Sequence, residues 1–297
     1  QELMQEAKNV MIMGHTNGDI DSMGASMGLY RLAKSLNVDA YIVNNSTGIS
    51  LENFIEATRA EKEYQEVIIN KAEALSKISP ETLLIIVDTH KRSYVEVPEL
   101  LEETNKIVII DHHRKSPDFI EEAILTFHEV YASSACELVT EILEYAPKEI
   151  QLTTLEAEAL YAGIMMDTKN FTFKTGVRTF EAAAYLRRCG IDIIKVKKWF
   201  QSDLKTYTKI SKIIDNAEII NETIGISIYD ENDKDANVIC AKAADELLTI
   251  SDITASFVIG KLGDKVCISG RSIGDINVQV ILEKLGGGGH ITLAGAQ

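Results

Sequence analysis

The chain has 297 residues, of which 45% are hydrophobic and 25% are charged, as expected of a globular protein with room for one large domain or two ordinary ones. Its formal net charge of −15 argues against long nucleic acid as a partner, because such binding needs a basic surface. No apolar run approaches the roughly 20 residues that span a bilayer, so this segment is not expected to contact a membrane. Four well-separated cysteines indicate free thiols in a reducing cytoplasm.

The first two-thirds of the chain alternates short aliphatic runs with segments of helical periodicity. Strands are predicted at residues 10–13, 40–43, 83–87 and 107–110. Helices are predicted at residues 22–36, 135–145, 155–166 and 179–189. Aliphatic strands separated by helices predict an α/β fold, in which a parallel sheet is covered by helices on both faces.

The pattern changes after Ile191. Residues 192–219 are expected to be mostly helical, and they contain no Gly- or Pro-rich linker. Beyond them, strands are predicted at 224–229, 255–259 and 266–269, and helices at 236–248 and 276–285. These elements predict a smaller α+β unit, so we expect a first domain at 1–195, a helical linker at 196–208 and a second domain at 209–297.

The first polar motif directly follows the strand predicted at 10–13. It contains His15, Asp19 and Asp21, on a loop that leads into a predicted helix. In an open parallel sheet, ligands gather outside the carboxyl ends of the strands, which places these side chains where functional sites occur. The alternative is that Asp19 or Asp21 caps the following helix, a common role for Asp.

Further polar residues lie at comparable positions. Asp88 ends the aliphatic run 83–87, and Asp111, His112 and His113 directly follow the run 107–110. Asp167 ends the helical segment 155–166. Asp88 or Asp167 alone would be interpreted as a solvated aspartate. An aspartate followed by two histidines at a strand end is rarer and is a stronger indication of a functional site.

Together these residues predict a metal centre, because a parallel sheet would bring their segments to one edge. Imidazole and carboxylate ligands without thiolate suit manganese or another divalent ion of similar hardness. Two ions that share a carboxylate can activate water and stabilise phosphoryl oxygens. Without metal, so many acids would repel one another. The pattern alone therefore predicts a two-metal phosphoesterase.

A separate motif lies near the end of the chain. Gly286, Gly287, Gly288 and Gly289 precede His290, and glycines allow backbone amides to approach a phosphate. Arg271 is a candidate for a second contact to the anion. A surface salt bridge is an equally good interpretation of this residue. Of the remaining histidines, His90 is interpreted as an outer partner of Asp88, and His128 as structural.

These motifs resemble the DHH phosphoesterase superfamily. Asp111-His112-His113 is similar to its name motif, and residues 15–21 are similar to its H-x-N-x-D-x-D signature. The second unit resembles the DHH-associated C-terminal domain with its GGGH-type ending. Residues 270–280 look most like the GdpP group of bacterial cyclic-di-AMP phosphodiesterases. The resemblance covers nearly the whole chain, although Gly18 stands where the family often has Pro, and Ser22 where it often has Ala.

The resemblance implies two manganese ions. The residues expected to hold the first are His15, Asp19 and Asp88, and those for the second are Asp21, Asp88, His112 and Asp167. His113 would contact the scissile phosphate or its leaving oxygen, and Asp111 would orient the histidines. The residues expected to hold substrate from the second domain are Arg271, Gly286, Gly287, Gly288, Gly289 and His290.

The implied activity is hydrolysis of cyclic di-AMP to 5′-pApA by a metal-bridging hydroxide, in a cleft between the two domains. Two alternatives stay open: hydrolysis of linear substrates such as pApA and pAp, and nucleotide sensing without hydrolysis. By the same resemblance, the chain is expected to be the cytoplasmic catalytic part of a longer protein that is anchored in the bacterial cell membrane. A homodimer is also left open.

Overall fold

The computed structural model describes residues 1–45, 52–289 and 291–297. It divides into two compact units, Gln1–Phe200 (unit 1) and Gln201–Gln297 (unit 2), and each is described by itself. The division falls within residues 196–208, the stretch predicted as a linker. Within the described ranges, no helix combines the length and apolar character needed to cross a membrane.

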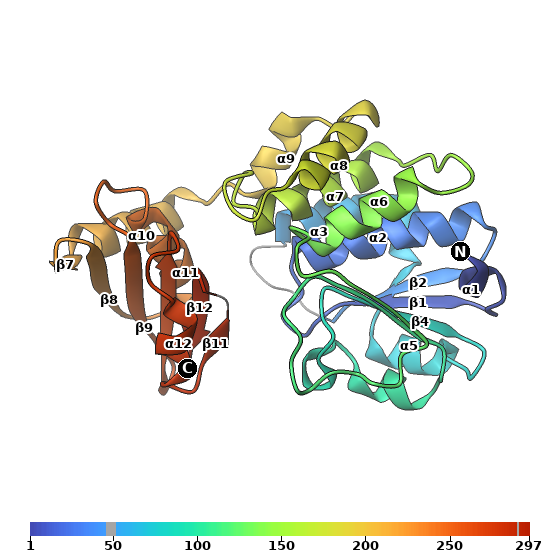
Figure 1. Cartoon of the computed structure of the whole chain (residues 1–297), viewed down its shortest axis with the longest axis horizontal. Coiled ribbons are helices and arrows are strands. Elements are labelled where there is room, and N and C mark those ends of the chain that lie inside the picture. The colour runs from blue at the N-terminus through green and yellow to red at the C-terminus, as the bar shows by residue number, and fades with distance from the viewer. Residues whose placement is uncertain (46–51, 290) are drawn as a thin grey trace. The chain divides into compact units, whose positions relative to one another are not determined.

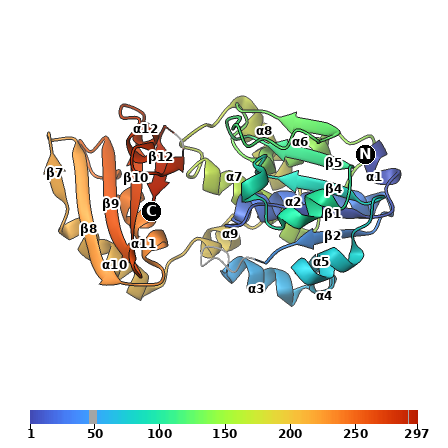
Figure 2. The same ribbon diagram turned by 90° about the horizontal axis from the view of Figure 1, so that it is seen from below.

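Unit 1 is built on a sheet of six strands in which all neighbours are parallel. Their order across the sheet is β3-β2-β1-β4-β5-β6, and Figure 2 labels its central strands β2, β1, β4 and β5. The strands are β1 (Val10–Met13), β2 (Ala40–Val43), β3 (Ile68–Ile69), β4 (Leu83–Val87), β5 (Ile107–Asp111) and β6 (Leu125–His128). The predicted parallel sheet is confirmed. Strands β3 and β6 were missed, because β3 has two residues and β6 is not an aliphatic run.

The central strands β1, β4 and β5 are buried along their whole length. Successive side chains of a strand point to opposite faces, so alternate residues enter two cores. Ile12 and Ile85 lie in one core, whereas Met11 and Ile86 lie in the other. Both faces of the sheet are therefore covered, as Figure 1 shows with α2, α6 and α7 on one side and α5 on the other.

The helices of unit 1 are grouped by the face of the sheet that they cover. On the first face lie α2 (Ile20–Ser35), α3 (Glu52–Ala60), α6 (Ala135–Glu144), α7 (Thr154–Asp167), α8 (Val177–Arg188) and α9 (Ile193–Trp199). The second face is covered by α5 (Lys71–Lys77) and the 3-10 helix η3 (Pro98–Glu102). The short helices α1 (Glu2–Gln5), α4 (Lys62–Gln65) and η2 (Arg92–Tyr94) complete the unit.

Helices α2 and α7 approach each other closely through glycines. A Cβ added to Gly24 of α2 would lie 2.6 Å from the carbonyl oxygen of Ala159 in α7. A Cβ added to Gly163 of α7 would lie 2.8 Å from the Cα of Asp21. Because real Cβ atoms do not approach other atoms so closely, glycine is needed at both positions. This contact fixes the start of α2 against α7.

Unit 2 contains a mixed sheet in the order β11-β12-β10-β9-β8-β7 (Figure 2). Only the β8–β9 pair is parallel among its described strand pairs. Its elements are α10 (Leu204–Asp215), β7 (Glu218–Ile220), β8 (Ile224–Asn232), α11 (Ala236–Leu247), β9 (Ala255–Leu262), β10 (Lys265–Ser272), α12 (Val278–Glu283), β11 (Gly288–Gly289) and β12 (Leu293–Ala296). The predicted second α+β domain is confirmed.

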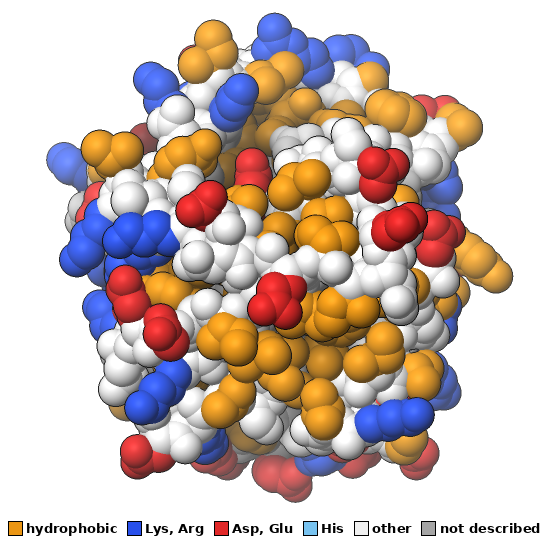
Figure 3. All heavy atoms as spheres, turned by 90° about the vertical axis from the view of Figure 1, so that its left-hand side faces the viewer, with side chains coloured by type: hydrophobic (Ala, Val, Ile, Leu, Met, Phe, Trp, Pro, Cys, Tyr) orange, Lys and Arg blue, Asp and Glu red, His pale blue; other side chains and the backbone are white. Residues whose placement is uncertain are grey.

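Residues 192–219 are less uniform than the expected helical stretch. Helix α9 ends at Trp199, and α10 begins at Leu204 after Asp203, whose side chain accepts the backbone N–H of Thr206 as a cap. The stretch then runs into strand β7, where Ile219 and Ile220 are exposed. Figure 3 shows several exposed hydrophobic side chains close together, among charged ones, on the face that it draws.

Candidate metal centre

The polar residues predicted in unit 1 meet at the carboxyl edge of its parallel sheet. His15 follows β1, Asp88 follows β4, and Asp111 ends β5 just before His112 and His113. Asp19 and Asp21 lie at the start of α2, while Asp167 is the last residue of α7. Side chains that are distant in sequence therefore come together where the strand order predicts a ligand site.

One group of possible metal ligands consists of His15, Asp19 and Asp88. The Nε2 atom of His15 lies 3.2 Å from Oδ2 of Asp88 and 3.9 Å from Oδ1 of Asp19. A ligand atom from each of these residues lies within 4.8 Å of the other two. This spacing allows the three residues to hold one cation.

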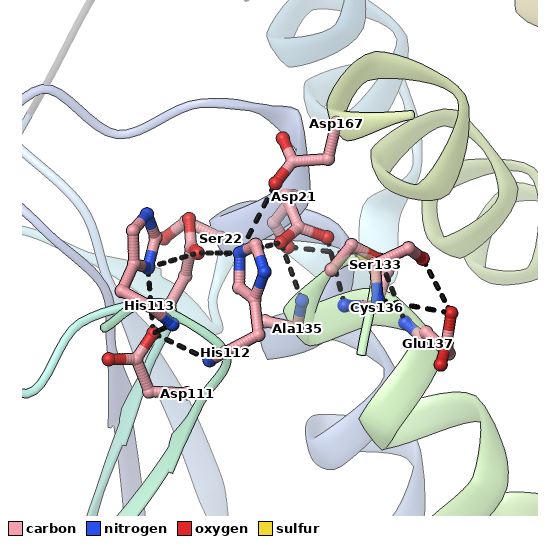
Figure 4. A network of polar contacts seen from close by, with 12 residues as sticks. Asp21, Ser22, Asp111, His112, His113, Ser133, Ala135, Cys136, Glu137 and Asp167 are labelled. Carbon is pink, nitrogen blue, oxygen red and sulfur yellow. Dashed lines mark hydrogen bonds and ion pairs between the residues drawn. The ribbon is translucent and has the colours of Figure 1, made fainter. Parts of the chain in front are cut away.

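A second group consists of Asp21, His112 and Asp167. The Nε2 atom of His112 lies 3.8 Å from Oδ2 of Asp21 and 3.2 Å from Oδ2 of Asp167 (Figure 4). It is also 3.3 Å from Oδ1 of Asp88. Asp88 thus faces the first group with one oxygen and the second group with the other.

Backbone N–H groups hold the two aspartates of α2 in place. Both carboxylate oxygens of Asp21 accept bonds from α6, at 2.7 Å from Ala135 N and 2.8 Å from Cys136 N (Figure 4). Asp19 accepts from the backbone N–H groups of Asp21 and Ser22 and so caps α2. The capping alternative is therefore confirmed for Asp19, and it coexists with a place in the first group.

Asp88 itself has an unusual backbone, with φ of 60°. A left-handed conformation is disfavoured for residues with a side chain, and Asp and Asn tolerate it better than others. Such conformations persist where the surroundings hold them, and they cluster at functional sites. Here the backbone turn directs a carboxylate that is only 3% exposed toward His15 and His112.

Asp111 lies behind the two groups and is completely buried. Its Oδ1 accepts from the backbone N–H of His112 at 2.8 Å and pairs with Nδ1 of His113 at 2.8 Å. Its Oδ2 is bonded to Nδ1 of His90. Burial alone would raise the pKa of Asp111, but the bonds with His113 and His90 hold it well below its usual range. Asp111 therefore orients the residues that follow it.

The two groups are electrostatically unbalanced without a cation. Burial and the charge of Asp88 raise the pKa of Asp19 to about 6, and the same causes raise the pKa of Asp21 well above its usual range. Burial lowers the pKa of His15, but its hydrogen bond to Asp88 and the charge of Asp19 raise it to about 9. Crowded carboxylates and a strongly basic imidazole are what metal ligands show when no ion balances them.

Unpartnered polar atoms test whether a metal fits. Among the described residues, the buried side-chain atoms without a hydrogen-bond partner are His15 Nδ1, Asp88 Oδ1, His112 Nδ1, His112 Nε2 and Glu158 Oε2. Leaving a buried polar atom unpaired costs about 1–3 kcal/mol, so such atoms are rare. Asp88 Oδ1 and His112 Nε2 converge at 3.3 Å without hydrogen-bonding geometry. The residues present therefore fit a divalent cation.

The sequence did not predict the positions of two residues that lie beside the centre. The ring of Tyr94 stacks on His15, but Tyr94 belongs to a 3-10 helix without a motif. His90 contacts Asp111, whereas the sequence interpretation placed it beside Asp88. His128 donates to the carbonyl oxygen of His113, in keeping with a structural role.

In unit 2, the glycine run has structural reasons of its own. Gly286 has φ of 79° after α12, and a Cβ on Gly287 would lie 2.0 Å from the carbonyl oxygen of Gly295. Gly289 has φ of 146° and contacts β12 closely, whereas a Cβ on Gly288 would meet nothing within 4 Å. His290 lies outside the described residues.

Arg271 is the other residue predicted to hold substrate. Its side chain is mostly buried, its Nε donates to Asp245 at 2.9 Å, and its Nη1 donates to the carbonyl oxygen of Gly270 at 3.0 Å. The salt bridge expected as the alternative role of Arg271 is therefore present. It is not fully on the surface, because the arginine side chain is buried while that of Asp245 is exposed.

Fold and site together define a two-unit α/β protein with a carboxylate and imidazole centre at a sheet edge. The chain belongs to the DHH family: residues 9–164 match its N-terminal domain, and residues 216–297 match the DHHA1 domain. It is 46% identical over its full length to a protein named cyclic-di-AMP phosphodiesterase GdpP in Geobacillus thermodenitrificans. It is 42% identical to the protein of the same name in Bacillus subtilis.

The chain spans 46% of the length of each of these relatives. Among solved structures, an exopolyphosphatase-related protein from Bacteroides fragilis superposes with a TM-score of 0.85. That match covers 100% of this chain and 88% of the other, at 18% sequence identity. At this identity the likeness shows the fold alone.

Proposed function

We propose that this chain hydrolyses cyclic di-AMP to linear 5′-pApA with divalent metal ions held by unit 1. The observation that carries the proposal is the position of Asp88, whose two oxygens face two separate groups of metal-binding side chains. The choice of substrate is supported by relatives named for cyclic di-AMP that are 42% and 46% identical over the whole chain.

The proposed ligands of one ion are His15, Asp19 and Asp88, and those of the other are Asp21, Asp88, His112 and Asp167. This set of oxygen and nitrogen donors, without thiolate, suits manganese. When bound, two such ions would lower the pKa of water and neutralise charge on the phosphoryl oxygens. The backbone bonds to Asp19 and Asp21 hold these two ligands in place before any ion arrives.

His113 is the proposed contact to the reacting phosphate. Its side chain is 33% exposed, unlike the buried ring of His112. Its Nδ1 is directed to Asp111, so we propose that substrate meets the Nε2 side of the ring. Hydrolysis adds a water oxygen to phosphorus and breaks the bond to a ribose 3′-oxygen, which must gain a proton. A protonated His113 is the proposed donor of that proton.

Unit 2 is proposed to bind substrate through Gly286–Gly289, Arg271 and His290. Gly288 supports this assignment best, because open space at its Cα leaves room for a phosphate against the backbone. Arg271 supports it less, since two of its nitrogens already donate within unit 2.

The test is turnover of cyclic di-AMP, cyclic di-GMP, pApA and pyrophosphate by purified protein with manganese, magnesium or chelator. The expected result is metal-dependent conversion of cyclic di-AMP to pApA at the highest kcat/KM of the four. A higher kcat/KM on linear pApA would instead favour an oligonucleotide hydrolase. Absence of turnover on all four, in protein shown by calorimetry to bind manganese, would overturn the proposal.

Binding without hydrolysis is the remaining alternative, and one variant separates it. Asp88→Asn should lower turnover more than 100-fold relative to wild type, whereas a sensor would bind cyclic di-AMP and convert it neither as wild type nor as this variant. Membrane anchoring of a longer parent protein and a homodimer also stay predictions, and ultracentrifugation of the chain tests the second.

A further inference from the structure

A second cluster of titratable side chains lies beside the metal centre. His90, Asp111 and His128 each place a nitrogen or oxygen within 4.8 Å of the others. His90 and Asp111 are completely buried. By composition and spacing alone, this cluster could be taken for another metal site.

Its hydrogen bonds indicate a different role. The backbone N–H of Ser116 donates to His90 Nε2 at 2.9 Å, and His90 Nδ1 is bonded to Oδ2 of Asp111. His128 Nε2 is bonded to the carbonyl oxygen of His113. Among the described residues, buried side-chain atoms without a hydrogen-bond partner occur in His15, Asp88 and His112, but not in His90, Asp111 or His128. The cluster is therefore a closed hydrogen-bond network rather than a cation site.

The direction of each bond can be assigned. A backbone N–H can only donate, so His90 Nε2 must accept from Ser116, and the ring carries its proton on Nδ1. That proton is donated to Oδ2 of Asp111. The other oxygen of Asp111 then accepts from His113. One continuous series of bonds thus runs from the backbone of Ser116 to the ring of His113.

We propose that His90 is a positioning residue, which fixes the carboxylate of Asp111 and through it the ring of His113. Without a partner for Oδ2, the Asp111 carboxylate could turn about its terminal torsion, which is broad for Asp. The ring of His90 is itself held by the backbone N–H of Ser116, and Phe119 packs beside it with 5.2 Å between ring centroids. The catalytic consequence rests on the proposed function, but the hydrogen-bond assignment does not.

Two substitutions separate the bonds of His90. In His90→Asn, the amide nitrogen replaces Nδ1 and keeps a donor toward Asp111. In His90→Gln, the longer amide replaces Nε2 and keeps a partner for Ser116 but not for Asp111. His90→Gln should lower kcat for cyclic di-AMP about 10- to 100-fold with KM nearly unchanged, as is typical for outer partners of a reactive group. His90→Asn should recover most of that loss.

Phe119→Leu is the matched control, because it alters packing on the His90 ring but removes no hydrogen bond to Asp111. It should leave kcat within about threefold of wild type, as expected for a volume change without lost polar contacts. Equal losses of kcat in His90→Asn, His90→Gln and Phe119→Leu would overturn the proposal, since packing alone would then explain them.

Nitrogen NMR of the imidazole rings supplies a readout independent of turnover. Wild-type His90 should carry its proton on Nδ1, and His113 should show an Nδ1 proton that is lost or averaged in His90→Gln but kept in His90→Asn. A proton on Nε2 of His90, or an unchanged His113 in His90→Gln, would overturn the proposal. If wild type hydrolyses none of the substrates, the proposed function fails, while these spectra still decide the assignment of His90.

Discussion

The ring of Tyr94 lies almost parallel to the imidazole of His15, with 5.1 Å between ring centroids and 6° between planes. Its hydroxyl accepts a hydrogen bond from Asn17 at 3.1 Å. His15 and Val95 also form an isolated β-bridge, so the backbone beside Tyr94 is tied to the metal-centre loop. Tyr94 therefore packs against His15, a proposed metal ligand.

Tyr94→Leu should weaken manganese binding by about tenfold, the low end of the effect of residues that orient ligands. Tyr94→Phe keeps the stacked ring and loses only the bond with Asn17, so its affinity should stay close to wild type. Isothermal titration with manganese measures both. Equal affinities for wild type and Tyr94→Leu would show that the ring does not position His15.

Asp88→Asn should lower turnover more than 100-fold, beyond the usual loss for an outer partner, because the shared carboxylate is removed. Asn is the right replacement, since it tolerates the φ of 60° at this position, whereas Ala would add backbone strain. Circular dichroism should be unchanged. Retention of wild-type kcat would remove Asp88 from the proposed centre.

Metal binding should stabilise the chain more at higher pH. The pKa of Asp19 is raised to about 6 from 3.8 and that of His15 to about 9 from 6.5. For each group, the stabilising contribution is full below the unfolded value and is lost as pH rises through the folded value. The metal-free chain therefore loses these contributions between about pH 4 and pH 9.

Metal ions bind the deprotonated forms of Asp19 and His15, so they offset the loss of stability that appears as these groups lose their protons with rising pH. Thermal unfolding with manganese and with chelator, compared at about pH 5 and about pH 8, should show a larger gain in Tm at the higher pH. A gain that is equal or larger at the lower pH would contradict the assignment of Asp19 and His15 as ligands.

Neighbouring glycines of unit 2 should respond differently to alanine. Gly287→Ala places a Cβ 2.0 Å from the carbonyl oxygen of Gly295 and should destabilise the unit by more than about 2 kcal/mol. Gly288→Ala meets nothing within 4 Å and should change the free energy of unfolding by less than about 0.5 kcal/mol.

If Gly288 faces substrate phosphate, Gly288→Ala should still raise KM for cyclic di-AMP. Urea unfolding and steady-state kinetics on the same preparations separate the two effects. A wild-type KM for Gly288→Ala would leave the glycine run with a structural role only.

The sequence was sufficient for the parallel sheet and for the meeting of His15, Asp88 and His112. Aliphatic runs of four or five residues mark β1, β4 and β5, and a polar residue after each parallel strand must reach the same sheet edge. These inferences need only local patterns and one topological rule.

Contacts that depend on loop conformation could not be predicted in this way. The position of His90 against Asp111 requires the path taken after β4, and Tyr94 reaches His15 from a short 3-10 helix. Likewise, the glycine run suggested a phosphate site, whereas Gly287 and Gly289 are also required by their close approach to β12. No spacing in the sequence encodes that approach.

The glycine contact between α2 and α7 has a consequence for engineering this protein. Helices α2 and α7, which carry Asp21 and Asp167, meet through close contacts at Gly24 and Gly163, and these contacts help to set the spacing of the two carboxylates. A search for a more heat-tolerant variant should therefore keep glycine at both positions while other core side chains of unit 1 are varied. Any residue larger than glycine at position 24 or 163 would change that spacing directly.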